Sequence, residues 1–273
     1  MAYLNVSGER RIYYEHYPAG RVAVVFAHGW GMGCRVWDNT VACLQDAGIG
    51  VVTYDQRGCG RSDKDFPDVS IEALGTDLAA LCGHLSLAAP VLNGWSLGGA
   101  VVIDAAARLG SSLAGVVLTC GATPRYTRTS DFPYGGSPAD VAATVAALRA
   151  DRVNFLKTLY YQGVFSRDVG DDVKHWCWQI ALQASPAADA SLAALASLDQ
   201  RALMSRIDAP ALVVVGANDA VVAPDIERAA ARHLRNAQLL EMHGCGHAPF
   251  LEDPVAYHAA LLRFVGELQA KRQ

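Results

Sequence analysis

The sequence predicts an α/β fold in which a mostly parallel sheet carries helices on both faces. Short apolar, β-branched runs of strand length alternate with longer stretches whose apolar residues recur at three- and four-residue spacing, as in amphipathic helices. The short runs are continuously apolar, which is typical of strands buried on both faces. The predicted parallel strands are residues 22–27, 50–54, 90–93, 115–119, 211–215 and 238–242, and the predicted helices are residues 36–47, 71–85, 97–109, 226–234 and 254–268.

Two segments depart from this alternation. Residues 3–6 and 11–17 flank a Ser-Gly-Glu-Arg turn and predict a hairpin that extends the sheet antiparallel. Residues 124–208 contain no convincing strand, and helical patterns at 139–159 and 171–184 predict a helical insertion there. We therefore expect a core domain of residues 1–123 and 209–273 with a helical cap, or lid, of residues 124–208.

Composition excludes several classes of protein. With 273 residues, 52% apolar and 18% charged, the chain is long and apolar enough for one substantial core. A net charge of −4 without a basic stripe argues against nucleic acid and anionic membranes as partners. No apolar run approaches the ~18 residues of a membrane span, and the first residues lack the pattern of a secretory signal, so we expect a cytoplasmic protein. The composition leaves the oligomeric state open.

The most informative motif is Gly94-Trp95-Ser96-Leu97-Gly98, which follows a predicted strand and opens a predicted helix. A serine on such a strand-to-helix turn adopts a strained backbone, and the flanking glycines remove clashes with neighbouring chain. The turn exposes the Ser96 hydroxyl above the sheet edge. Ser96 is therefore the candidate nucleophile.

A serine hydroxyl needs a base to take its proton and a carboxylate to orient that base. Asp219 follows the predicted strand 211–215, and two histidines, His243 and His247, follow the strand 238–242. We assign the base to His247, which lies deeper in the loop before the last helix, and expect His243 to help hold that loop. The order Ser96, Asp219, His247 is the one expected when a serine nucleophile sits on this turn.

The oxyanion of an acyl-transfer intermediate needs hydrogen-bond donors. We expect these to be the backbone amides of Trp30, in the loop His28-Gly29-Trp30-Gly31, and of Leu97. His28 is expected to brace that loop. The glycines of the loop do not form a dinucleotide-binding motif, and neither the histidines nor the seven cysteines show metal-ligand spacing, so we expect no cofactor and no metal.

In order along the chain, five motifs resemble those of the α/β-hydrolase family. They are His28-Gly29-Trp30-Gly31, the loop 54–62, Gly94-Trp95-Ser96-Leu97-Gly98-Gly99, Gly216-Ala217-Asn218-Asp219 and Gly246-His247-Ala248-Pro249-Phe250. Within the family, the chain is similar to pimeloyl-carrier-protein methyl ester esterases and to cofactor-free haloperoxidase-like esterases. The resemblance implies an eight-stranded sheet with the cap inserted after strand six, and hydrolysis by acyl transfer.

The sequence therefore predicts a carboxylic ester hydrolase, a serine esterase that acts on a small-molecule ester. Substrate contacts are expected from Trp30 and from three cap aromatics, Phe132, Tyr160 and Trp176. Four alternatives remain open at this point: a thioester hydrolase, a carrier-protein methyl ester hydrolase that uses basic residues of the cap, a cofactor-free perhydrolase, and a ligand receptor that retains the triad.

Overall fold

The computed structural model describes residues 2–271, which form one eight-stranded sheet in the order β1-β2-β4-β3-β5-β6-β7-β8. The β1–β2 and β2–β4 pairs are antiparallel and the other five pairs are parallel. The predicted mostly parallel sheet with an antiparallel hairpin at its start is thus confirmed. The strands are β1 (Ala2–Ser7), β2 (Arg10–Tyr17), β3 (Ala23–Ala27), β4 (Gly50–Tyr54), β5 (Val91–Trp95), β6 (Gly115–Thr119), β7 (Ala211–Gly216) and β8 (Ala237–Met242).

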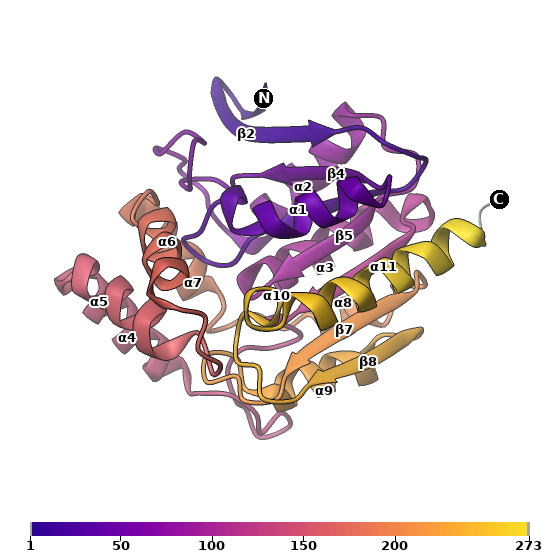
Figure 1. Cartoon of the computed structure of the whole chain (residues 1–273). Helices are drawn as coiled ribbons and strands as arrows, with labels where there is room; N and C mark the ends of the chain where they lie inside the picture. Colours follow the sequence, from indigo (N-terminus) through magenta and orange to yellow (C-terminus); the bar gives the residue numbers. More distant parts are fainter. Residues whose placement is uncertain (1, 272–273) are drawn as a thin grey trace.

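Helices cover both faces of the sheet (Figure 1). One face carries α1 (Asp38–Asp46) and α11 (Pro254–Ala270), preceded by the short helices η1 (Cys34–Trp37) and α10 (Pro249–Glu252). The other face carries α2 (Ile71–His84), α3 (Leu97–Leu109) and α9 (Pro224–His233), with the short turn η2 (Gly110–Ser112) after α3. None of the helices within residues 2–271 is long and apolar enough to cross a membrane.

The two faces correspond to two apolar cores that divide each central strand between them. In β3, Val25 and Ala27 belong to the core under α2, α3 and α9, whereas Val24 and Phe26 belong to the core under α1 and α11. Successive side chains of a strand point to opposite faces, so a strand buried on both sides must be apolar at every position. This explains why the central strands appear in the sequence as continuous apolar runs.

Between β6 and β7 the chain leaves the sheet as a set of helices beyond its carboxyl edge (Figure 1). They are α4 (Pro138–Ala150), α5 (Arg152–Thr158), the π-helical turn η3 (Leu159–Gly163), α6 (Asp171–Ala181), η4 (Pro186–Ala188), α7 (Asp189–Ala194) and α8 (Arg201–Met204). We call the helices α4 to α7 the cap. The last of the set, α8, packs against α3 and α9 of the core.

The helix expected over residues 139–159 is in fact two helices. Asp151 ends α4 in an extended conformation (φ −152°, ψ 77°), and its side chain accepts a hydrogen bond from the backbone amide of Asn154. An aspartate that bonds a nearby amide in this way competes with helix continuation and begins a new helix instead. The break gives α5 a direction of its own.

A buried ion pair fixes the loop that follows β4. Arg57 donates from Nε and Nη2 to the two carboxylate oxygens of Asp77 on α2, at 2.6 and 2.7 Å, and both side chains are almost fully buried. The same loop supplies Gln56, which binds His28 beside the predicted oxyanion loop. The ion pair therefore stabilises a segment that supports the site.

We expect Asp77→Ala to lower the free energy of unfolding by about 3–5 kcal/mol, because it leaves the Arg57 guanidinium buried without its counterion. Equilibrium denaturation in urea measures this change. Asp208→Ala is the matched control, since Asp208 pairs with Arg235 on the surface and both side chains are mostly exposed. Equal effects of the two substitutions would contradict the assignment of a structural role to the buried pair.

Candidate active site

Ser96 lies at the turn between β5 and α3 in a strained backbone conformation, with φ 57° and ψ −123°. The turn is tight because its glycines allow close approach of the chain. A Cβ atom on Gly94 would lie 2.2 Å from the carbonyl oxygen of Gly98, and one on Gly98 would lie 2.3 Å from that of Ala27. The backbone of Ser96 is held by the Thr119 carbonyl oxygen, which accepts its amide proton at 3.1 Å. The conformation predicted from the Gly-x-Ser-x-Gly motif is therefore present.

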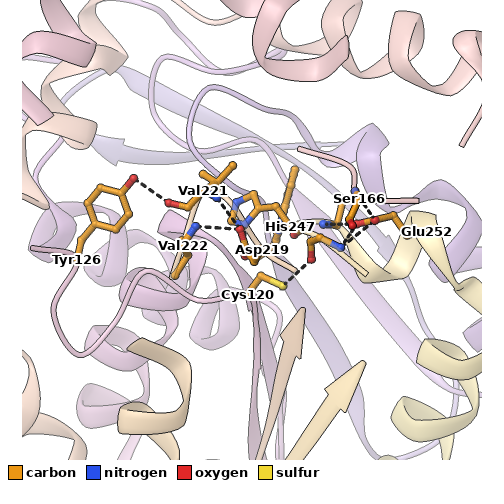
Figure 2. A network of polar contacts seen from close by, with 11 residues as sticks. Cys120, Tyr126, Ser166, Asp219, Val221, Val222, His247 and Glu252 are labelled. Atoms are coloured by element: carbon orange, nitrogen blue, oxygen red, sulfur yellow. Dashed lines mark hydrogen bonds and ion pairs between the residues drawn. The ribbon is translucent and has the colours of Figure 1, made fainter. Parts of the chain in front are cut away.

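His247 and Asp219 meet at the carboxyl edge of the sheet. His247 Nδ1 donates to Asp219 Oδ2 at 2.7 Å (Figure 2). The other carboxylate oxygen of Asp219 accepts from the backbone amides of Val221 and Val222, at 2.7 and 2.9 Å. Because a carboxylate can only accept, this bond keeps the proton on Nδ1 and leaves Nε2 free to accept one. His243, in contrast, is exposed, and its carbonyl oxygen accepts from Arg167.

Trp95 holds the backbone of His247 from below. Its indole Nε1 donates to the His247 carbonyl oxygen at 2.7 Å, and the two rings lie 5.5 Å apart between centroids. Phe250 packs edge-on against Trp95 at 5.1 Å. Trp95, the residue before Ser96, thus supports His247 by packing and by one hydrogen bond.

Glu252 joins the His247 loop to the cap, and the sequence analysis missed it. Its carboxylate accepts hydrogen bonds from the backbone amides of Gly246 and Ala248 in the loop and of Ser166 and Arg167 after the cap turn η3 (Figure 2). The His247 amide also donates to the Val164 carbonyl oxygen at 2.8 Å. The sequence signal was an acidic residue in the first turn after the His-Ala-Pro-Phe motif, where helix amides are unpaired.

A small cavity of about 90 Å³ lies above Ser96 and His247. Among the residues predicted to contact substrate, Trp30 and Tyr160 line it. Leu97, a predicted oxyanion donor, also lines it. Phe132 packs edge-on against Tyr134 at 5.0 Å, and Trp176 packs on the core under α1 and α11, so neither reaches the cavity. The apolar lining that the sequence analysis did not single out consists of Ala122, Tyr126, Phe155, Leu159, Val164, Leu192, Leu195 and Val221.

Trp30 and Leu97, whose backbone amides are the predicted oxyanion donors, both line this cavity. In the described part of the chain, neither amide donates a hydrogen bond to another group of the protein. The Trp30 loop is braced as expected, because His28 accepts at Nε2 from the amide of Gln56 at 3.0 Å and is itself buried. Backbone amides without a partner in the protein are available to bind a negatively charged oxygen.

The Cys120 thiol and the Glu227 carboxyl group lie close to Asp219. Cys120 Sγ donates to the Gly246 carbonyl oxygen at 3.6 Å, and burial with nearby Glu227 and Asp219 raises the pKa of this thiol well above its ordinary value. Glu227 on α9 is fully buried, and neither of its carboxyl oxygens has a hydrogen-bond partner among the described residues. Burial, together with the Asp219 carboxylate, raises the pKa of Glu227 well above the ordinary range of a glutamate.

Within residues 2–271, the side chains that offer metal-ligand atoms close together are those of Cys120, Asp219 and His247. All three are buried. The facing atoms of Asp219 and His247 already bind each other. The arrangement therefore suits proton transfer through His247.

Fold and site together define an α/β hydrolase, and the chain belongs to the alpha/beta hydrolase family, whose model matches residues 24–260. It is 30% identical to a non-heme chloroperoxidase of Streptomyces lividans over 97% of this chain and 99% of that one. It is 31% identical to a pimeloyl-(acyl-carrier protein) methyl ester esterase of Neisseria meningitidis over 89% and 93%. An esterase from Exiguobacterium antarcticum shares the fold with a TM-score of 0.93, 22% identity and coverage of 97% and 98%. The resemblance predicted from the motifs is thus confirmed.

We expect Glu252→Gln to destabilise the protein and to lower its hydrolytic activity by about tenfold or more. Glutamine keeps one accepting oxygen, but its NH2 group would face the backbone amides that bind the other carboxylate oxygen, and each lost charge-assisted bond costs about 1.5–3 kcal/mol. Thermal unfolding and limited proteolysis of the cap measure the change. Glu267→Gln on the exposed side of α11 is the control. Unchanged proteolysis of the cap in Glu252→Gln would contradict the role of Glu252 in linking the cap to the His247 loop.

We expect Glu227→Gln to become more stable relative to the unsubstituted chain as pH rises from 5 to 8. A group whose folded pKa is raised stabilises the fold below its unfolded pKa and loses that contribution as pH rises toward its folded pKa. Glutamine does not titrate, so the difference between the two melting temperatures should grow with pH.

Glu241→Gln is the control of opposite sign, because Arg228 lowers the pKa of Glu241. Between pH 5 and 8 its melting temperature should lie below that of the unsubstituted chain by a nearly constant amount, and the difference should shrink as pH falls from about 4.5 through the lowered folded pKa of Glu241. A pH-independent difference for Glu227→Gln would mean that Glu227 ionises in the folded protein as it does in water.

Proposed function

We propose that the protein hydrolyses carboxylic esters through a catalytic triad of Ser96, His247 and Asp219. The observation that carries the proposal is the 2.7 Å bond between His247 Nδ1 and Asp219 Oδ2, with His247 and the strained Ser96 lining the same cavity. This combination matches a nucleophile, a base and an orienting carboxylate in their required order. Membership of the alpha/beta hydrolase family supports it.

In the mechanism, Ser96 Oγ attacks the ester carbonyl carbon while His247 Nε2 takes the hydroxyl proton. The C–O bond to the alcohol then breaks, and His247 returns the proton to the leaving oxygen. Water attacks the acyl-enzyme by the same route and releases the acid. The amides of Trp30 and Leu97 donate to the oxyanion of each tetrahedral intermediate. Asp219 stabilises the imidazolium that forms twice per cycle.

The cavity favours a short, uncharged group beside the reacting carbonyl. Its volume of about 90 Å³ is well below the roughly 300–1,000 Å³ of pockets that enclose drug-sized ligands. His247 is the one titratable base that lines it, and its lining has no Lys, Arg, Asp or Glu. A charged acyl group would lie there without a counterion, which is costly.

We propose that the cap acts as a lid over Ser96 within a segment of residues 124–208. Several cations of this segment are already engaged: Arg125 pairs with Asp199, Arg152 with Asp189, and Lys174 with Asp168. Cations neutralised in this way offer little attraction to an acidic carrier protein. We therefore favour a small-molecule ester over a carrier-bound one.

A second candidate function is peracid formation, in which peroxide replaces water at the acyl-enzyme. The relative named a non-heme chloroperoxidase, similar over nearly its whole length, favours this candidate. The same residues would serve both reactions. The two reactions are separated by comparing the rate of peracetic acid formation from acetate and hydrogen peroxide with the rate of ester hydrolysis in water.

We expect Ser96→Ala to lower kcat for p-nitrophenyl acetate by about 10⁴-fold or more, because the nucleophile is removed. Asp219→Asn should lower it by about 10³–10⁴-fold. Asparagine keeps an oxygen for the amides of Val221 and Val222 but loses the carboxylate that fixes the His247 tautomer. Release of p-nitrophenol is the measurement.

His243→Ala is the control and should retain activity. Inactivation by His243→Ala with retention in His247→Ala would overturn the choice of base. Release of no more than about one product per molecule, with esters and thioesters alike, would instead identify a ligand receptor built on the same triad.

A further inference from the structure

The small cavity above Ser96 shares two wall residues with a larger groove on the outside of the cap. The groove has a volume of about 590 Å³ and is open to solvent. Phe155 and Leu159 are the two residues that line both the cavity and the groove. Two apolar side chains therefore separate the reacting serine from an external channel on α4 and α5.

These two side chains lie on one face of a helix. They are four residues apart, Phe155 within α5 and Leu159 at the start of the π-helical turn η3, and both are half-buried. Side chains with this spacing stack one above the other. The Val164 amide donates to the Leu159 carbonyl oxygen at 3.0 Å, which closes the widened π turn. Such turns are rare, occur mostly as bulges within α-helices, and are frequently found at functional sites.

The groove is suited to an uncharged hydrocarbon chain. Its floor includes Ala147, Phe155 and Leu159. Its polar rim includes Asp151 and Asn154, and the Asn154 side-chain amide donates to Asp151 at 2.8 Å. Hydrogen bonds from Asn154 lower the pKa of Asp151, so the rim is negatively charged at neutral pH. A chain that ends in a carboxylate would be repelled there.

We propose that this groove is a binding subsite for the aliphatic chain of an ester whose carbonyl reacts at Ser96, with Phe155 and Leu159 as the gate between the two chambers. The cavity alone is too small for a long chain, and the shared wall makes the groove its continuation. Rotation of two apolar side chains, without movement of a helix, would join them. The inference rests on the proposed esterase function.

The test fills the groove without touching the cavity. Ala147 is exposed on α4 and lines the groove but not the cavity, so Ala147→Trp blocks the subsite. We expect kcat/KM for p-nitrophenyl decanoate or for decyl acetate to fall by about tenfold or more, the effect of about two methylene groups losing contact. Activity on p-nitrophenyl acetate should stay unchanged. The two long esters distinguish an acyl chain from an alcohol chain in the groove.

The matched control is Ala146→Trp, one residue away on α4, exposed and outside both chambers. It should leave both long and short esters unaffected. Leu159→Ala should raise the ratio of long-ester to short-ester kcat/KM, because it opens the gate. An unchanged ratio in both Ala147→Trp and Leu159→Ala would overturn the proposal.

Binding separates this proposal from the esterase function. In the Ser96→Ala background, calorimetric titration with 2-dodecanone, an uncharged ketone with the shape of a long ester, should give a Kd about tenfold weaker when Ala147→Trp is added. Equal affinity in the two backgrounds would exclude the subsite. If the unsubstituted chain hydrolyses no ester but binds the ketone, and Ala147→Trp weakens that binding, only the esterase function is rejected.

Discussion

The buried carboxylate of Glu252 is the contact on which the geometry of the site depends. It accepts from four backbone amides, two in the loop that carries His247 and two in the segment between η3 and α6 of the cap. Those segments are about 80 residues apart in sequence. A Cβ on Gly246 would lie 2.8 Å from the Ser166 amide nitrogen, so the two loop segments are in close contact there. The position of His247, the proposed base, is thus tied to the position of the cap.

Backbone pairing in the sheet brings together the three residues of the proposed triad. Ser96 follows β5, Asp219 follows β7 and His247 follows β8, and parallel strands bring their carboxyl ends to one edge. The strained backbone at Ser96 costs of order 1–3 kcal/mol. Gly94 and Gly98 make the turn possible, because a Cβ at either position would clash with neighbouring backbone, and hydrogen bonds of the Ser96 backbone with Thr119 and Ala122 hold it in place. Rigid strands therefore position the chemistry.

Features that depend on local sequence could be predicted, whereas features that depend on contacts between distant segments could not. The positions of Ser96, Asp219 and His247 after strands were predictable because each depends on a local pattern of a few residues next to a strand. Glu252 and Glu227 were not, since their roles depend on amides and carboxylates that come close only in the folded chain. The cavity lining was predicted in part: Trp30 and Tyr160 line it, whereas Phe132 packs on Tyr134 instead. Aromatic content alone does not tell which ring faces a pocket.

The cap is anchored at a point that leaves its gate free. Arg152, at the start of α5, donates to Asp189 at 2.8 Å, and its guanidinium lies 5.9 Å above the ring of Trp30. Trp30 in turn donates from Nε1 to the Ala188 carbonyl oxygen at 3.3 Å. These contacts fix one end of α5 against the Trp30 loop, whereas the side chains of Phe155 and Leu159 further along make apolar contacts. Substitutions at those two positions can therefore change which chains reach Ser96 without disturbing the groups that react.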